Sequence, residues 1–485
     1  MKRTKIMILL LLLTATYTAA AQYNSDNNLF YHTFRSPQSN SLNAAFFPSQ
    51  SNVYFQLPST GVQFGMPVAV GDFVRYDADQ QITVIDINRL IDTISETNQI
   101  RLGADVNLLG FGFKMGHTFV TFNTRINNNV NIGLPISALN AVLNGNVDAN
   151  GNPVTELTVI DGDLINAQSY LEASVGLGHY FEAIKLTVGA RAKLLYGIAN
   201  AQSSNTRAVL ETGEDFNNMN ARLYYELQAS LFAPFDTSAK MFIFDSMLAN
   251  PNVGTSFDIG AKFDLGPFSF SASINDISTG IHWKSNGYTL KPKNGETSIT
   301  YDGFSINTIM DEGTINTDSL GTYFTERLEE MTEVSIEDTC NYWYGIPTKF
   351  NLGASVSLAK MLRAGLLFHG QLDKGMFNNK NQIFDKEAFV EGFRYNTFRF
   401  NTTLSLHFNL KNWIELVAGS SVVYDGENID YFNPGAGIIM APGSLFQLYV
   451  MADYISSIYI IDSKAFNIRA GVNVIIGKGR RKPLS

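Results

Sequence analysis

The sequence predicts an all-β fold, a transmembrane antiparallel β-barrel of about 14 strands. Apolar and polar residues alternate in many short segments, no second long apolar run follows the N-terminal one, and charged residues make up only 16% of the chain. In a strand successive side chains point to opposite faces, so one face of such a segment suits lipid and the other suits water. A sheet of this kind must close on itself in a membrane, because an open edge would leave backbone groups unpaired.

The N-terminus has the organisation of a secretory signal peptide. Lys2, Arg3 and Lys5 precede an apolar run over residues 6–13, and three alanines precede Gln22. The run is too short for a membrane span, which needs about 20 apolar residues, so we expect cleavage before Gln22. The absence of a cysteine after that site excludes a lipoprotein anchor. The predicted location is the outer membrane of a Gram-negative bacterium, with outer-membrane lipid as the surrounding partner.

Charge and cysteine content exclude several classes of protein. The formal net charge is −9, and it becomes −12 without the three cations of the signal peptide. This excess of acid argues against nucleic acid as a partner. The single cysteine, Cys340, cannot form an intramolecular disulfide, so closure of the sheet must stabilise the fold.

Six pairs of alternating segments, each joined by a tight turn, predict twelve strands. The pairs are 102–115 with 118–132, 171–181 with 184–198, 257–264 with 268–275, 349–358 with 362–373, 398–409 with 414–424, and 435–440 with 445–455. An opening strand over 60–68 and a closing strand over 466–476 raise the count to fourteen, which places both ends in the periplasm. Residues 207–234 could add an extracellular hairpin or a strand pair. A change of phase near Leu109 and Gly110 predicts a β-bulge.

The phase of each strand predicts which charged side chains face the lumen. In 398–409 the even positions are apolar, which directs Arg399 and His407 inward. The same rule gives the whole predicted luminal set: Glu172, Lys185, Arg191, Lys193, Asp258, Lys262, Arg363, His369, Arg399, His407, Glu415, Asp453 and Arg469. Two interpretations are open. The charges pair with one another or with an inserted plug, which we favour, or they line a passage that selects polar solutes.

Aromatic residues near strand ends predict the membrane interfaces. Trp413 follows a predicted periplasmic turn, Trp343 and Tyr344 precede the strand that contains Phe350, and Tyr424 ends another strand. Amphipathic rings favour the headgroup region of a bilayer. These four residues are therefore expected at the interfaces.

Three long connections are predicted to project outward, over residues 71–100, 133–168 and 276–347. Helical spacing within 320–331 and 135–143 predicts short helices that either gate the barrel mouth or only rigidify the loops. The acidic residues between 311 and 338 suit calcium, a basic partner or, in the favoured interpretation, solvent. Asp148, Asn150 and Gly151 lack the ligand spacing of a calcium loop. We therefore expect no metal and no cofactor.

Several motifs resemble a known family. They are residues 268–276 (FSFSASIND), 281–286 (IHWKSN), 346–353 (IPTKFNLG), 446–449 (FQLY) and 467–473 (NIRAGVN). Together they resemble a family of Bacteroidota outer-membrane proteins of unknown function, of the domain of unknown function 5723 type. That family is distantly similar to FadL-like fatty-acid transporter barrels, whose fourteen strands enclose an N-terminal plug. The resemblance implies a fold and carries no chemistry.

The resemblance implies a luminal hatch at the N-terminus, which we assign to residues 22–59. The transporter group has an Asn-Pro-Ala element there, and this chain has Asn43-Ala44-Ala45, without the proline. The predicted hatch residues are Asn43 and five aromatic residues, Phe30, Tyr31, Phe34, Phe46 and Phe47. The aromatic residues either pack against the wall, which we favour, or line an apolar pocket. The barrel then covers 60–477, and residues 478–485 form a basic periplasmic tail that is solvated or binds an acidic partner.

Three classes of function follow from these predictions. The first is a gated or plugged transport channel for small or hydrophobic molecules. The second is a barrel without transport activity that serves as a subunit of a secretion, assembly or uptake complex with other outer-membrane proteins or lipoproteins. The third, a lipid-hydrolysing enzyme, is not expected, because no spacing in the sequence places a nucleophile, a base and an orienting acid on one rim.

Overall fold

The structure is a computed structural model and describes a defined part of the chain. The described residues are 27–49, 51–66, 68–77, 82–86, 89, 98–134, 137, 154, 156–161, 164–212, 219–230, 251–284, 287–292, 297–301, 310–311, 314–315, 334–338, 342–373, 376–377, 397–410, 413–424, 429–442, 445–455 and 463–477. The predicted signal peptide, the basic tail, Cys340, the 320–331 helix, the calcium-like residues and, apart from Ser137, the 135–143 helix lie outside them.

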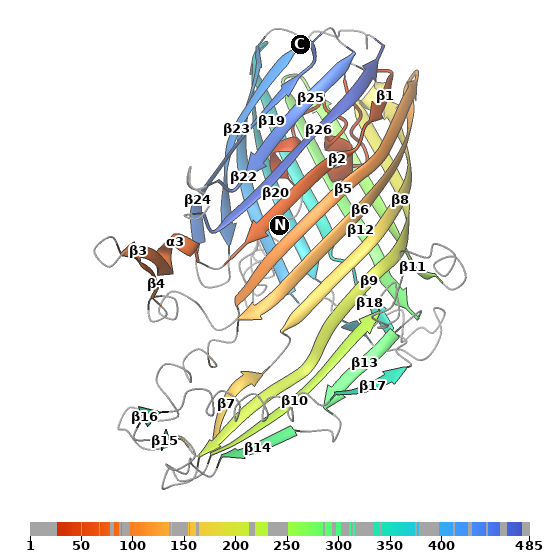
Figure 1. Ribbon diagram of the computed structural model, residues 1–485. Coiled ribbons are helices and arrows are strands. Elements are labelled where there is room, and N and C mark those ends of the chain that lie inside the picture. Colours follow the sequence, from red (N-terminus) through yellow and green to blue (C-terminus); the bar gives the residue numbers. More distant parts are fainter. Residues whose placement is uncertain are drawn as a thin grey trace, which may run out of the picture.

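The wall is a closed antiparallel barrel of 14 strands (Figure 1). β1 (Val53–Gln56) and β2 (Ser59–Gly65) form one interrupted wall strand, since each pairs with both β26 and β5. The other wall strands are β5 (Asn98–Met115), β6 (Thr118–Leu134), β8 (Ile165–Phe181), β9 (Leu186–Thr212), β11 (Asn252–Leu265), β12 (Phe268–Trp283), β19 (Thr348–Ala359), β20 (Leu362–Asp373), β22 (Thr397–Leu410), β23 (Ile414–Tyr424), β24 (Ile429–Met440), β25 (Phe446–Asp453) and β26 (Ala465–Ile476).

The six predicted hairpins and the bulge are confirmed. Each predicted pair is an antiparallel ladder in the wall, and the register of β5 against β6 shifts between Asn107 and Leu109. Glycines with positive φ make two of the tight turns, Gly116 at 58° and Gly266 at 58°. The predicted end of the hatch at Ser59 was too late, because Val53–Gln56 already pairs on both sides as wall strand β1.

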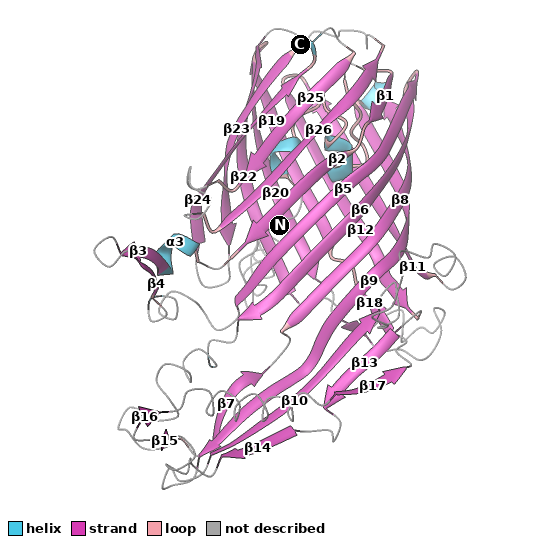
Figure 2. Cartoon of the chain, in the orientation of Figure 1, coloured by secondary structure: helices cyan, strands magenta, loops and turns pink. Residues whose placement is uncertain are grey.

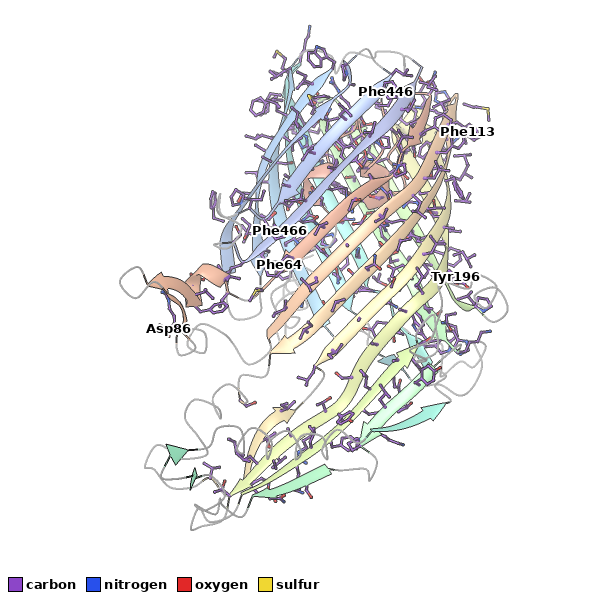
Figure 3. All side chains as sticks on the ribbon, viewed as in Figure 1. Phe64, Asp86, Phe113, Tyr196, Phe446 and Phe466 are labelled. Atoms are coloured by element: carbon purple, nitrogen blue, oxygen red, sulfur yellow. The ribbon has the colours of Figure 1, made fainter. Side chains whose placement is uncertain are left out.

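The outside of the barrel is apolar, and the inside is polar. On β11, Phe257 and Ile259 are 54% and 52% exposed, whereas the intervening Asp258 is 1% exposed. Phe64 of β2 and Phe466 of β26 stack across neighbouring strands with their ring centroids 5.6 Å apart (Figure 3). Exposed apolar side chains over a closed sheet match a lipid-facing surface. The protein is therefore a membrane-spanning β-barrel.

The same sheet continues beyond the barrel end opposite the C-terminus (Figure 1). The outer part of the 27-residue strand β9 pairs with β10 (Met219–Ser230) and β7 (Glu156–Asp161). Strand β10 pairs in turn with β13 (Gly287–Pro292) and β14 (Thr297–Tyr301), and β13 pairs with β17 (Val334–Asp338). The extra hairpin considered for residues 207–234 is therefore present, as the pairing of β9 with β10.

Short elements complete the described structure (Figure 2). Strand β18 (Tyr342–Tyr344) pairs with β12 and β21 (Met376–Phe377), and two hairpins are formed by β3 (Val74–Asp77) with β4 (Ile82–Ile85) and by β15 (Met310–Asp311) with β16 (Thr314–Ile315). The helices are η1 (Asn28–Phe30), α2 (Ser39–Leu42), α3 (Val70–Phe73) and η2 (Glu182–Ile184). Among the described residues, no helix has both the length and the apolar character to cross a bilayer.

Candidate functional site

Residues 27–51, named the plug below, lie inside the barrel and precede wall strand β1 (Figure 2). The plug consists of η1, α2 and turns, because its Ser, Thr and Asn side chains bond to nearby backbone groups instead of favouring a ladder. Thr33 Oγ1 donates to the Phe30 carbonyl at 2.7 Å, and Ser39 Oγ donates to the Ser36 carbonyl at 2.9 Å. The described plug therefore carries its own local structure into the lumen.

One side of the plug packs on an apolar part of the wall. The cluster joins plug residues Leu29, Phe30, Tyr31, Leu42 and Phe46 with wall residues Leu367, Val417, Ile439, Tyr449 and Met451 of β20, β23, β24 and β25. Phe34 packs against this cluster from a partly buried position. Phe47 contacts Tyr54 and Phe119, with ring centroids 5.4 and 5.0 Å apart. All five plug aromatics thus contact other side chains in the lumen.

Wall side chains also hold the plug backbone. The Leu42 carbonyl accepts from Ser273 Oγ at 2.8 Å, Asn275 Nδ2 at 2.8 Å and Asn351 Nδ2 at 2.9 Å. Asn43 donates to the Ala272 carbonyl at 3.1 Å, and its Oδ1 accepts from the Ala45 amide at 2.9 Å. These bonds satisfy plug groups that no strand partner reaches.

Two glycines in the wall allow close approach of the plug. A Cβ at Gly189 on β9 would overlap the Ala44 carbonyl, and a Cβ at Gly260 on β11 would overlap the Asn43 side chain. The two glycines are register partners in neighbouring strands. Any larger residue at either place would displace the plug backbone or the wall.

Four of the predicted luminal residues form one buried cluster. Lys193 Nζ lies 2.6 Å from Asp276 Oδ1, 3.0 Å from Asp258 Oδ1 and 3.8 Å from Glu172 Oε1. Arg191 pairs with Asp258 at 3.2 Å, and Arg125 pairs with Glu172 at 3.3 Å. The sequence analysis missed Arg125 and Asp276. The phase of 118–132 would have indicated Arg125, whereas Asp276 follows the end of the predicted strand and gave no such signal.

Other predicted luminal residues contact the plug. Arg363 Nη1 donates to the His32 carbonyl at 3.2 Å, and Arg363 and Lys262 lie 4.6 and 4.5 Å from the centroid of the Phe34 ring. Asp453 Oδ2 accepts from the Asn28 amide at 2.6 Å. His369 and Arg469 are also luminal: His369 Nδ1 lies 2.7 Å from Asn351 Oδ1, and Arg469 lies 2.5 Å from Asp105.

Two predicted site residues need correction, and the side chains of two others are not described. Lys185 does not line the lumen: it is exposed in the turn after η2, with φ of 53°, because the strand begins only at Leu186. Tyr344 is not an interface residue: it is buried with Trp283, Tyr342 and Leu195. The side chains of Arg399 and Tyr424 lie outside the described residues. At the predicted interface, Trp413 is 41% exposed, and Trp343 stacks on His282 at 4.6 Å.

The structure also brings together Ser405, His407 and Glu415, which the sequence analysis did not connect. His407 Nε2 lies 3.1 Å from Ser405 Oγ, and Nδ1 lies 3.1 Å from Glu415 Oε1. This is the order of a nucleophile, base and acid. All three side chains are buried, and the plug residue His32 lies over them, with its ring centroid 6.3 Å from that of His407. In this state the group supports plug docking and is closed to a substrate.

His32 itself is a buried neutral imidazole. Its Nε2 donates to the Leu366 carbonyl at 3.2 Å, and its Nδ1 is buried without a hydrogen-bond partner. Burial, the His407 ring and the nearby cations Arg363 and Lys262 lower the pKa of His32 to about 3. The docked plug therefore disfavours a proton on this ring.

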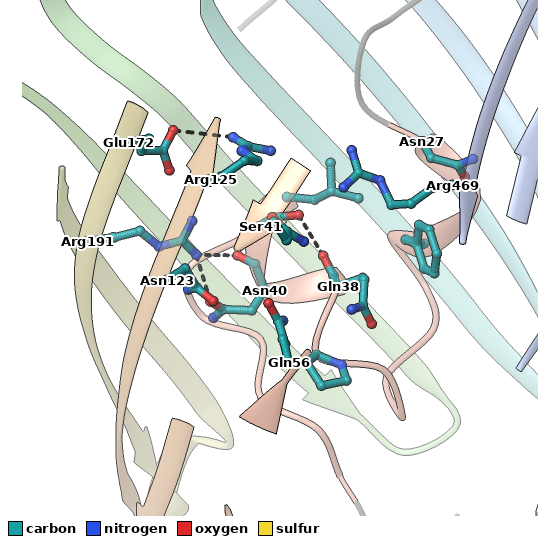
Figure 4. A pocket seen from close by; sticks show the side chains of 14 residues that line it. Asn27, Gln38, Asn40, Ser41, Gln56, Asn123, Arg125, Glu172, Arg191 and Arg469 are labelled. Carbon is teal, nitrogen blue, oxygen red and sulfur yellow. Dashed lines mark hydrogen bonds and ion pairs between the residues drawn. The ribbon is translucent and has the colours of Figure 1, made fainter. Parts of the chain in front are cut away.

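A polar hollow separates the other side of the plug from the wall (Figure 4). Arg191 spans it and donates through Nη2 to the Asn40 carbonyl and, at 2.8 Å, to Asn40 Oδ1. The hollow offers about 30 Å³ to water-sized molecules, room for about two waters. Its lining consists of Asn27, Phe30, Pro37, Gln38, Asn40, Ser41, Leu42, Gln56, Asn107, Asn123, Arg125, Glu172, Arg191 and Arg469. Among the described residues, no group of three His, Cys, Asp or Glu could hold a metal ion.

Comparisons with known proteins agree with a barrel and leave the activity open. No curated protein sequence matches the chain. Similar solved structures include a FadL homologue of Pseudomonas aeruginosa, at 8% identity and a TM-score of 0.46, with 95% of this chain and 100% of that chain covered. The toluene transporter TodX of P. putida has 9% identity and a TM-score of 0.39, with 91% of this chain and 92% of that chain covered. The toluene transporter TbuX of Ralstonia pickettii has 7% identity and a TM-score of 0.43, with 91% of this chain and 94% of that chain covered.

Identities and TM-scores this low transfer no activity to the chain. The sequence itself carries a more specific relation, since one family model covers residues 45–453 and so includes most of the barrel and the end of the plug. The chain belongs to this family, DUF5723, a family of unknown function.

Proposed function

We propose that this protein is an outer-membrane channel gated by its own plug. The observation that carries the proposal is the two-sided seating of the plug: one side packs on the apolar cluster of β20, β23, β24 and β25, and the other faces the polar hollow. A plug that served only to stabilise the barrel would contribute more stability if apolar side chains packed on all of its sides. The polar side is the side on which solutes can be hydrated.

The contacts of the plug suit a displaceable gate. Within the described residues it is joined covalently to the wall only where Ser51 and Asn52 lead into β1, and its other contacts are hydrogen bonds, ring contacts and apolar packing. The Leu42 carbonyl, the Asn28 amide and the His32 carbonyl are held by luminal side chains that solvent could replace.

The first test compares the single-channel conductance of the wild type with that of a variant lacking residues 22–50, both in planar bilayers. We expect a clear rise in conductance, because the deletion removes the plug residues that pack against the wall inside the lumen. Heat-dependent mobility on gels checks that the shortened barrel has folded. Equal conductance in both folded proteins would contradict the proposal.

A second test leaves the chain intact. Asn28 of the plug donates to Asn401 of β22 at 2.7 Å, so cysteines at both places, in a Cys340→Ser background, can be joined by a short reducible bis-thiosulfonate. We expect the link to suppress opening and a reducing agent to restore it. Cysteines at Asn128 and Ser169, a wall-to-wall pair on β6 and β8 whose side chains lie 2.7 Å apart, provide the matched control. Equal gating in linked plug and control proteins would argue against a moving plug.

The alternative, a barrel subunit of an outer-membrane complex, is favoured by a different feature. The extension built on β7, β9, β10, β13, β14 and β17 projects beyond the barrel and provides a surface for another protein. Purification from native membranes in mild detergent would then yield a stoichiometric partner that is lost when residues 203–228 are replaced by a short turn. Recovery of the barrel alone would leave the channel as the better proposal.

A further inference from the structure

We infer that the hollow beside the plug is an anion-selective constriction, so that the proposed channel conducts small anions and carboxylate solutes in preference to cations. The inference rests on the proposed channel function and adds the class of solute. It follows from three observations: the residues that line the hollow, the position of the counter-charges, and the apolar packing of the plug against β20, β23, β24 and β25.

The lining carries more positive than negative charge. Its charged members are Arg125, Arg191 and Arg469 against Glu172 alone. The remaining polar members include the amides of Gln38, Asn40 and Asn123, which can donate hydrogen bonds to an anion. The local excess is notable because the chain as a whole is acidic, with a formal charge of −9.

The acids that balance two of these arginines are set away from the lining. Arg191 pairs with Asp258 at 3.2 Å and Arg469 pairs with Asp105 at 2.5 Å, and neither acid lines the hollow. Arg191 and Asp258 are almost fully buried, so solvent screens their fields little. The lining therefore includes these guanidinium groups but not the carboxylates of Asp105 and Asp258. A low-dielectric wall strengthens this difference in potential.

Apolar packing closes the side of the plug that lies against β23, β24 and β25. There Leu29, Tyr31 and Phe46 form one cluster with Val417, Ile439 and Met451, and all six side chains are at most 3% exposed. An ion crossing such a contact would lose its hydration without replacement. An ion that passes beside a seated plug is therefore expected to follow the polar hollow, where the guanidinium groups lie, and not this apolar contact.

The test measures the reversal potential of the purified wild-type barrel in planar bilayers under a gradient of potassium chloride. We expect chloride to permeate better than potassium. The double variant Asp105→Asn/Arg469→Gln keeps a hydrogen-bonding pair and the same total charge, yet removes one lining guanidinium. It should lower the chloride-to-potassium ratio by at least about twofold. Asp105→Asn alone removes a negative charge behind the lining and should raise the ratio.

The matched control is Arg207→Gln. Arg207 has a 57% exposed side chain and pairs with Glu156 on the extracellular sheet, so the permeability ratio should not change. The anion constriction would be overturned if the wild-type channel prefers potassium, or if the double variant does not change the chloride-to-potassium permeability ratio. Either result would still be consistent with the proposed channel function. Conductance only after deletion of residues 22–50 would also overturn it, because ions would then not pass beside the plug. Silence of both proteins would instead refute the channel itself.

Discussion

Lys193 Nζ lies 2.6 Å from Oδ1 of Asp276, at the place where β12 departs from regular geometry. Asp276 has a φ of 60°, in the left-handed region that non-glycine residues seldom adopt. The same ammonium group also forms ion pairs with Asp258 and Glu172, so Lys193 pairs with carboxylates from three strands. This contact links β8, β9, β11 and β12 beneath the plug and makes Lys193 the centre of the luminal charges.

Replacing Lys193 with Met should destabilise the barrel more than any other single luminal change in this cluster. The substitution leaves three buried carboxylates with less compensation, and breaking a buried pair in this way costs about 3–5 kcal/mol. Urea unfolding followed by tryptophan fluorescence measures the loss. Lys185→Met, in the exposed turn eight residues earlier, is the control and should leave the midpoint unchanged. Equal midpoints for both variants would contradict the central role of Lys193.

Gly189→Val should expel the plug without disturbing the wall. Its side chain would overlap the Ala44 carbonyl, whereas the strand itself favours a β-branched residue. We expect a raised conductance and faster cleavage of residues 27–51 by added protease. Ala190→Val is the matched control, because this neighbouring residue is exposed on the opposite face of β9. Protection of the plug in Gly189→Val would show that the wall, not the plug, gives way.

The three tryptophans should report two different environments. Trp413 is 41% exposed on the apolar exterior, whereas Trp283 is fully buried with Tyr342 and Leu195. In single-tryptophan variants, lipids brominated near the headgroup should quench Trp413 strongly and Trp283 weakly, because bromine quenches on contact with lipid. Similar quenching at both sites would argue against the assigned inside and outside of the wall.

Acidification should release the plug, through His32. Its pKa is about 3 in the docked plug, against about 6.5 for a solvated imidazole, so only the released plug takes up a proton between these values. Docking of the plug therefore becomes less favourable as the pH falls from 6.5 towards 3. The equilibrium constant for docking decreases by up to about tenfold per pH unit. Open events should therefore be about 30-fold more frequent at pH 5 than at pH 7.5.

His32→Gln provides the matched variant for this pH dependence. Glutamine can still donate to the Leu366 carbonyl but does not titrate, so the acid-induced opening should be lost. His117→Gln, in an exposed turn with Glu182 at 3.6 Å, should keep the wild-type response. An unchanged response in His32→Gln would assign the titration to another group.

The wall was largely predictable because a strand in a membrane barrel obeys a local rule. Alternation within 349–358 or 398–409 reports lipid on one face and water on the other, whatever the rest of the chain does. The hairpins, the strand number, the bulge near Leu109 and the inward direction of Arg191, Lys193 and Asp258 all follow from that rule. It failed at Lys185, where the strand began later than its pattern suggested.

The plug and its contacts could not be predicted in the same way. Residues 27–51 have no periodicity, and the partners of Asn28, Leu42 and Asn40 are hundreds of positions away in some cases, as for Asn28 with Asp453. The Ser405, His407 and Glu415 group was missed because Glu415 lies across a turn on the next strand. Tyr344 was misplaced because an aromatic residue near a strand end is equally suited to an interface and to a buried cluster.

By itself, the sequence determined that this chain forms a closed outer-membrane barrel with an apolar exterior and a charged lumen, because side-chain alternation and turn chemistry act over a few neighbouring residues. Only the tertiary structure decided how the lumen is filled: which charges meet at Lys193, which wall carries the apolar seat of the plug, and where the polar hollow lies. These features depend on the register of fourteen strands around a closed sheet, which brings together residues that no local pattern connects.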